Sequence, residues 1–134
     1  MTKLILNTAI ANYGHTAEIK KGNIGSNRFE MEHNDISPVP MIFRRMVRNL
    51  EFDVAEMALA TYICSKHYQK KFTALPIFLT RGFYHTNMIY RKGAEIINPK
   101  DLEGKRVGVR SYTFTPGVWS RGILGSYHGV DLNS

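Results

Sequence analysis

Cysteine is almost missing from this 134-residue sequence, because Cys64 is the only one. A single cysteine excludes an intrachain disulfide framework and a cysteine-based zinc site. Long apolar runs are missing too, since none approaches the roughly 18 residues of a membrane span. The first residues lack the apolar core and the small-residue cleavage site of a secretory signal. These absences predict a chain without a membrane partner in a reducing, cytoplasmic setting.

Three common catalytic signatures are also lacking. The sequence contains no Gly-rich phosphate loop, no His-Glu-x-x-His helix and no Gly-x-Ser-x-Gly elbow. It has five histidines, but no two of them are four residues apart, whereas a catalytic zinc ion usually needs three ligands. We therefore predict no metal site and no cofactor. A divalent metal is left open, without a convincing ligand set.

Acidic residues are scarce, with 11 Asp and Glu against 18 Lys and Arg and a net charge of +7. Hydrophobic residues make up 43% of the chain, which indicates a globular protein. A positive excess is compatible with nucleic-acid binding, with a cleft for small acidic substrates or with solvated helix faces. The basic residues are dispersed and no basic-aromatic stacking motif accompanies them. We therefore predict no nucleic-acid partner, keep the cleft for a small acidic ligand and the solvated faces as alternatives, and leave the oligomeric state open.

Hydrophobic periodicity predicts alternating strands and helices, and hence an α/β protein with a mostly parallel sheet. The clearest helix has Ser37 as its N-cap, Pro38 as its first residue and an apolar stripe running to Leu50. Trp119 and Tyr127 are predicted to be core residues of the last helix. The predicted strands cover residues 3–9, 29–33, 52–55, 73–79, 87–90 and 106–109, and the helical segments lie within 12–20, 38–50, 59–67, 98–104 and 115–127.

Three candidate site residues are suggested by their position, since ligands gather at the carboxyl ends of parallel strands and at helix N-termini. Glu56 follows the strand at 52–55, where a carboxylate can accept a proton or anchor a hydroxyl group. The alternative is that it complements the dipole of the following helix. Thr115 opens the last helix, and Ser111 belongs to the same loop. The backbone amides there could bind an anion, or Thr115 could be an ordinary cap.

Four further candidates lie in loops. Arg81 and His85 stand between two predicted strands; arginine offers a planar fork to a carboxylate, and histidine exchanges protons near neutral pH. An exposed loop without a function is the alternative. Tyr13 and His15 follow the first predicted strand and are candidate ligand-binding residues.

Four short segments of the sequence form a recognisable set of motifs. They are Phe-Asp-Val-Ala-Glu-Met-Ala-Leu at 52–59, Arg-Gly-Phe-Tyr-His at 81–85, Asp-Leu-Glu-Gly-Lys-Arg-Val-Gly-Val at 101–109, and Thr115 with Val-Trp and Arg-Gly-Ile-Leu within 118–124. In order and spacing they resemble phrases of the 4,5-dihydroxyphthalate decarboxylase family. That family shares the two-lobed fold of type 2 periplasmic solute-binding proteins.

The resemblance implies two α/β lobes with a ligand cleft between them. Residues 1–103 would form the first lobe, and residues 104–134 would begin the second. Family members are about twice as long, so we expect a fragment or a short form that could be inactive. The phrase Asn-Tyr-Gly-His-Thr at 12–16 departs from the Asp-Tyr-Asp-Arg-Thr-like run of the family.

The resemblance further implies a decarboxylase that acts on a hydroxylated, phthalate-like aromatic dicarboxylate without a cofactor, and hence a small anionic aromatic ligand as the partner of this chain. In that function His85 would donate a proton to the ring, and Glu56 would bind the hydroxyl group. Arg81 and the helix end at Thr115 would hold the remaining carboxylate. The alternative is a solute-binding or sensor protein, similar to those of ABC transporters, that binds a small anion without chemistry.

Overall fold

The computed structural model describes residues 2–134, which divide into two compact units. The first unit comprises the described part of Met1–Ala58 together with Ser65–Leu75, and the second comprises Leu59–Cys64 and Pro76–Ser134. The lobe boundary between residues 103 and 104 stays a prediction. No helix in the described part of the chain is both long enough and apolar enough to cross a membrane.

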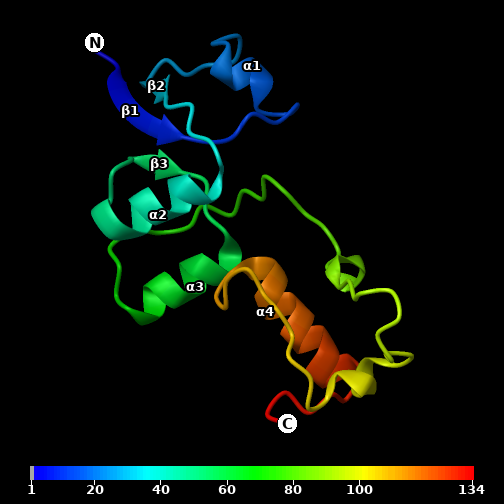
Figure 1. The fold of residues 1–134 in the computed structure, drawn as a ribbon. Helices are drawn as coiled ribbons and strands as arrows, with labels where there is room; N and C mark the ends of the chain where they lie inside the picture. The colour runs from blue at the N-terminus through cyan, green and yellow to red at the C-terminus, as the bar shows by residue number, and fades with distance from the viewer. Residues whose placement is uncertain (1) are drawn as a thin grey trace. The chain divides into compact units, whose positions relative to one another are not determined.

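The first unit contains a parallel sheet of three strands (Figure 1): β1 (Leu4–Ala9), β2 (Phe29–His33) and β3 (Val54–Ala55). Their order is β2-β1-β3, so the strand that comes first in the chain lies in the middle. The end of β1 pairs on both sides, because Thr8 is opposite His33 of β2 and Val54 of β3. The predicted α/β class with parallel strands is confirmed at this level.

Helix α2 (Pro40–Asn49) covers the sheet with one apolar stripe. Its residues Ile42 and Met46 form the core cluster of this unit together with Ala9 and Phe52. The helix ends at Leu50, whose φ of 51° is left-handed. This stripe was predicted, because apolar residues three and four positions apart fall on one helix face.

The predicted start of that helix was wrong by two residues. The N-cap is Val39 instead of Ser37, and Pro40 instead of Pro38 is the first helical residue. Both prolines satisfy the preference for proline in the first turn, so the sequence rule alone does not choose between them. The shorter α1 (Ala17–Lys20) lies at the end of the segment in which a helix was predicted.

The second unit is built from short helices. After α3 (Leu59–His67), which begins in this unit, come η1 (His85–Asn87), η2 (Pro99–Leu102), α4 (Thr115–Gly122) and the π-helical turn η3 (Ile123–Tyr127). The predicted turn at 98–104 is confirmed. It begins with a capping box between Asn98 and Asp101, and Gly104 follows it with a φ of +71°.

Three strands predicted after α3 were wrong. Among residues 2–134 the three-stranded sheet is the one sheet present, and segments 73–79, 87–90 and 106–109 do not join it. Their apolar side chains are exposed: 68% for Ile77, 94% for Ile89 and 61% for Val107. The composition favours a strand, but a strand also needs a neighbour to accept its backbone hydrogen bonds.

The core assignments in the last helical segment were also wrong. Trp119 is 53% exposed and Tyr127 is 78% exposed, whereas Ile123 and Leu124 are buried. Both exposed rings still make aromatic contacts, Trp119 with Tyr84 and Tyr127 with His85.

Candidate functional site

The first unit has a topological switch point at the carboxyl edge of its sheet. From β1 the chain crosses to β2 on one side, and from β2 it returns to β3 on the other side of β1. The connections therefore diverge at the carboxyl ends of β1 and β3, which is the place where open α/β sheets bind ligands. The chain after β1 carries Ala11 and Tyr13, and Glu56 directly follows β3.

The Glu56 carboxylate is the centre of this edge. Its Oε2 accepts a hydrogen bond from the Ala11 backbone amide at 3.0 Å, and its Oε1 accepts one from the Tyr13 hydroxyl at 2.5 Å. Its own backbone amide donates to the Ala9 carbonyl at 2.9 Å, which extends the pairing of β3 with β1. Glu56 is only 8% exposed, so its carboxyl group is buried with a hydrogen-bond donor on each oxygen.

The Tyr13 side chain has two partners, one at its hydroxyl group and one on the face of its ring. Burial, together with the hydrogen bond to Glu56 and the charge of that residue, raises the pKa of Tyr13 to about 12. The phenol therefore keeps its proton at neutral pH and donates it to Glu56. Its ring stacks on the His15 imidazole, with centroids 5.4 Å apart and planes 3° apart. The structure thus brings together three of the predicted site residues.

Thr16 stabilises the loop from Ala11 to Tyr13 through hydrogen bonds of its hydroxyl group. It was not predicted from the sequence as a site residue. Its Oγ1 accepts from the Tyr13 amide at 3.0 Å and lies 3.1–3.2 Å from the carbonyl oxygens of Tyr13 and Ala11. Thr16 is 5% exposed. A threonine whose hydroxyl bonds the backbone three residues earlier is a known turn device, so the Tyr-x-x-Thr spacing was the available signal.

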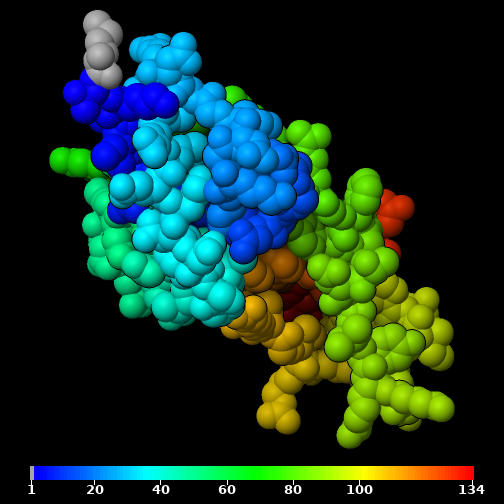
Figure 2. All heavy atoms as spheres, turned by 90° about the horizontal axis from the view of Figure 1, so that it is seen from above, coloured from blue at the N-terminus to red at the C-terminus, as the bar shows by residue number. Residues whose placement is uncertain are grey.

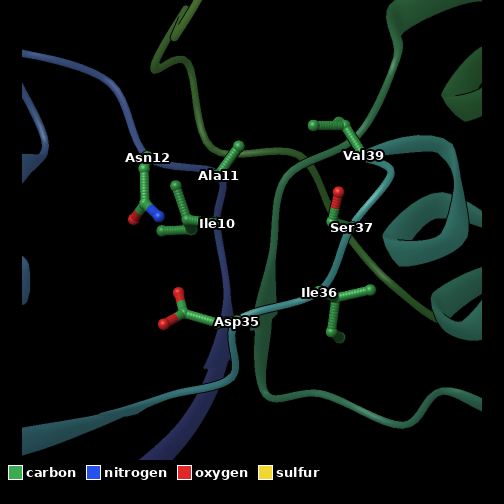
Figure 3. Close-up of a pocket in the computed structure, with 7 residues that line it drawn as sticks. All are labelled: Ile10, Ala11, Asn12, Asp35, Ile36, Ser37 and Val39. Atoms are coloured by element: carbon green, nitrogen blue, oxygen red, sulfur yellow. The ribbon is translucent and has the colours of Figure 1, made fainter.

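A hollow of about 280 Å³ adjoins this loop. Figure 3 shows its walls, which are the segment that follows β1 and the segment that leads from β2 into α2. Ala11 lines the hollow with its side chain and holds Glu56 with its amide, so the hollow and the carboxylate share one stretch of backbone. The lining residues are Ile10, Ala11, Asn12, Asp35, Ile36, Ser37 and Val39.

Lys20 joins the two walls of the hollow. Its Nζ donates to the Ile10 carbonyl at 3.0 Å, to Asn12 Oδ1 at 2.6 Å and to Asp35 Oδ1 at 2.8 Å. Figure 2 shows the blue segment around α1, which carries Lys20, packed beside the cyan segment that follows β2. The hydrogen bond from Lys20, followed by its charge, lowers the pKa of Asp35. All three protons of the ammonium group therefore hold the site's walls.

Replacing Lys20 by methionine is expected to destabilise the protein by about 1–2 kcal/mol, because the Ile10 carbonyl loses a charged donor. Lys21→Met is the matched control, since the Lys21 ammonium group bonds the exposed Glu18 carboxylate three residues away and the Lys21 side chain is 65% exposed. Urea unfolding followed by circular dichroism measures the difference. Equal midpoints for the two variants would contradict the role given to Lys20.

The second unit holds the other predicted residues, and their convergence with Glu56 stays a prediction. Arg81 is exposed, and its guanidinium lies 5.2 Å from the Phe78 ring centroid. His85 is also exposed, and its ring meets Tyr127 edge to face at 6.3 Å. Both side chains are accessible and neither is paired with a carboxylate in the described contacts. Each is therefore open to a ligand.

Thr115 is the first residue of α4, and Phe114 is its N-cap, so the predicted cap was wrong by one position. The Thr115 hydroxyl instead accepts a hydrogen bond from the Ala60 amide at 3.3 Å, which links the starts of α3 and α4. The loop before α4 packs closely against it, because a Cβ at Gly117 would lie 3.0 Å from the Ser111 carbonyl oxygen. The Ser111 side chain is exposed.

No group of three or more His, Cys, Asp or Glu side chains within residues 2–134 is arranged to hold a metal ion. The groups around Glu56 form the candidate site of the first unit. It consists of a buried carboxylate, a protonated phenol on it and an imidazole stacked on the phenol. Such groups bind hydroxyl donors and move protons.

An α/β protein with acid-base groups at the carboxyl edge of a parallel sheet is the class that these observations define. No family model matches the chain. Two curated relatives do match it, the 4,5-dihydroxyphthalate decarboxylases of Comamonas testosteroni and Pseudomonas putida. Each is 31% identical to this chain over 137 aligned positions, which include 97% of the chain. The resemblance to the 4,5-dihydroxyphthalate decarboxylase family is confirmed by these matches.

The match is one-sided in length. It includes 39% of the relative from Comamonas testosteroni and 50% of the relative from Pseudomonas putida. The chain therefore spans half, or less, of the length of these two relatives. Their whole activity does not pass to this chain by similarity alone.

Proposed function

We propose that this chain carries part or all of a decarboxylase site for a hydroxylated aromatic dicarboxylate similar to 4,5-dihydroxyphthalate. The observation that carries the proposal is the buried Glu56 carboxylate with its phenol donor at the carboxyl edge of the sheet. It lies in a chain that is similar over 97% of its length to two proteins named for this reaction.

The chemistry requires three kinds of group. A proton is added to the ring carbon that bears the departing carboxylate, and the carbon-carbon bond then breaks to release carbon dioxide. A ring hydroxyl para to that carbon, once it has given up its proton, supplies electrons that offset the loss of aromaticity. The site must therefore accept a proton from the hydroxyl, donate one to the ring and hold the remaining carboxylate.

The residues of the chain fit these roles by type. Glu56 and its phenol partner Tyr13 form the acceptor side. His85 is the proposed donor to the ring, because its imidazole is exposed and can exchange protons. Arg81 and the amide end of α4 at Thr115 are the proposed holders of the second carboxylate.

The test is release of carbon dioxide from 4,5-dihydroxyphthalate by the purified chain, with phthalate as the matched substrate that lacks both hydroxyl groups. The proposal expects release from the dihydroxylated compound alone. Release from neither compound would reject decarboxylation by this chain. Release from both would reject the role given to the hydroxyl group.

Binding without chemistry is the second candidate. It is favoured by the hollow of Figure 3, whose polar side chains Asn12, Asp35 and Ser37 can form hydrogen bonds to a solute. Calorimetric binding of 4,5-dihydroxyphthalate without release of carbon dioxide would support this candidate over the enzyme.

A further inference from the structure

We propose that Tyr13, and not Glu56, is the residue that meets the ligand's phenolic hydroxyl, and that Glu56 receives the proton through Tyr13. This inference rests on the proposed function. It adds a catalytic residue to the same site and a preference of that site for ligands with a hydroxyl donor. It also changes the part played by Glu56, which becomes a positioning residue that acts through its neighbour.

Access to the carboxylate is the first argument. Glu56 is 8% exposed, and each of its oxygens already accepts a hydrogen bond, from the Ala11 amide and from the Tyr13 hydroxyl. Tyr13 is only half-buried, so its side chain reaches from the carboxylate toward the surface. A ligand hydroxyl meets the phenol oxygen without displacing either donor on Glu56.

The fixed direction of the Tyr13 hydroxyl is the second argument. Thr16 holds the Tyr13 amide, the His15 ring supports the phenol ring, and the hydroxyl hydrogen is directed at Glu56. A phenol has one hydrogen to donate and further capacity to accept. Because that hydrogen is already used, the Tyr13 oxygen can only accept from a ligand. It therefore selects a hydroxyl donor and discriminates against a carboxylate at the same place.

The proton balance of the step is the third argument. As the ligand's O–H bond breaks, its proton forms a new O–H bond on Tyr13, while the original Tyr13 proton moves to Glu56 Oε1. The products are a ligand phenolate, a neutral tyrosine and a protonated Glu56, so total charge is conserved. The pKa of about 12 at Tyr13 agrees with a phenol that passes on a proton without persisting as tyrosinate.

The experiment compares the binding of 4,5-dihydroxyphthalate and phthalate by calorimetry and records the ultraviolet spectrum of the bound dihydroxylated compound. Wild-type protein is expected to prefer the dihydroxylated compound about tenfold or more. One hydrogen bond to the Tyr13 oxygen, which is itself bonded to the Glu56 carboxylate, has an effect of that size. A red-shifted phenolate band should accompany binding. Tyr13→Phe should abolish the preference and the band, with phthalate affinity within about twofold of wild type.

Glu56→Gln separates the positioning role from a structural one. It keeps the size of the side chain and an oxygen for Tyr13, so phthalate binding should persist while the phenolate band is lost. Tyr68→Phe is the matched control, because Tyr68 is 75% exposed and its ring contacts His67 instead of Glu56. It should behave as wild type in all three measurements.

Each contrary result has a distinct meaning. Wild-type protein that binds neither compound would overturn the proposed ligand class and this inference with it. Equal binding of both compounds by wild type would overturn only the inference. A preference and a phenolate band that survive in Tyr13→Phe would assign the contact to another group. Tighter binding by Tyr13→Phe would make Tyr13 an obstruction at the site, which also overturns the relay.

Discussion

Replacing His85 by alanine is expected to lower the single-turnover rate of carbon dioxide release by about 10²–10⁴-fold, the usual contribution of a general acid. Protonation of the ring carbon precedes the break of the carbon-carbon bond, so the loss of the donor slows the chemical step itself. Substrate affinity should change little, because the carboxylates are held by other groups in the proposed site. Rapid mixing of excess protein with 4,5-dihydroxyphthalate measures the rate of this step.

The structure supplies a close control for the loss of an imidazole. His85 and His128 both meet the Tyr127 ring edge to face, at 6.3 and 5.0 Å. His128→Ala therefore removes a comparable aromatic contact without removing the proposed donor, and its rate should stay near that of wild type. The His85 loop also keeps a second support in the stacking of Tyr84 on Trp119. A rate for His85→Ala within a few-fold of wild type would refute the assignment.

Local patterns predicted the parts of the fold whose hydrogen bonds are local or whose partners are close in sequence. The stripe of α2 was predicted because Ile42 and Met46 lie four residues apart on one face. The turn at 98–104 was predicted because its capping box involves Asn98 and Asp101 alone. A mostly parallel sheet was predicted from the alternation of strands and helices, which is also a short-range signal, and β1 and β2 do pair in parallel.

The strand predictions that failed depended on partners that local patterns do not supply. Residues 106–109 have the β-branched composition of a strand, yet Val107 and Val109 are exposed and belong to no ladder within residues 2–134. Proline in the segment 73–79 already removes one backbone donor from any ladder there. Composition indicates how well a side chain fits a sheet surface. It does not indicate whether a neighbouring strand is present.

The candidate site shows the same division between local and distant information. Their positions after predicted strands identified Glu56 and Tyr13 as two separate candidate site residues. Their contact at 2.5 Å depends on the strand order β2-β1-β3, which places the ends of β1 and β3 side by side. The sequence did not reveal that order, so it did not show that the two residues form one acid-base pair. Lys20 was missed for a similar reason, since its three acceptors lie 8–15 residues away.

The position of that pair depends on a small core, in which Ile42 is a fully buried residue whose loss should affect stability strongly. Ile42 is 0% exposed and packs with Ala9, Met46 and Phe52 between α2 and the sheet. Ala9 is the last residue of β1, and its carbonyl oxygen accepts a hydrogen bond from the Glu56 amide. The core and the site therefore share a residue. Loss of packing at Ile42 should therefore loosen the strand ends that hold Glu56.

Replacing Ile42 by alanine is expected to lower the free energy of unfolding by about 2–5 kcal/mol, through lost burial and the cavity left behind. Ile42→Val should cost only about 0.5–1.5 kcal/mol, so it gives a measurable value even where the alanine variant fails to fold. Ile24→Ala is the matched control from the same unit, because Ile24 is 60% exposed. Urea unfolding followed by far-ultraviolet circular dichroism measures all three, and equal losses for Ile42→Ala and Ile24→Ala would show that the cluster around Ile42 is not the core.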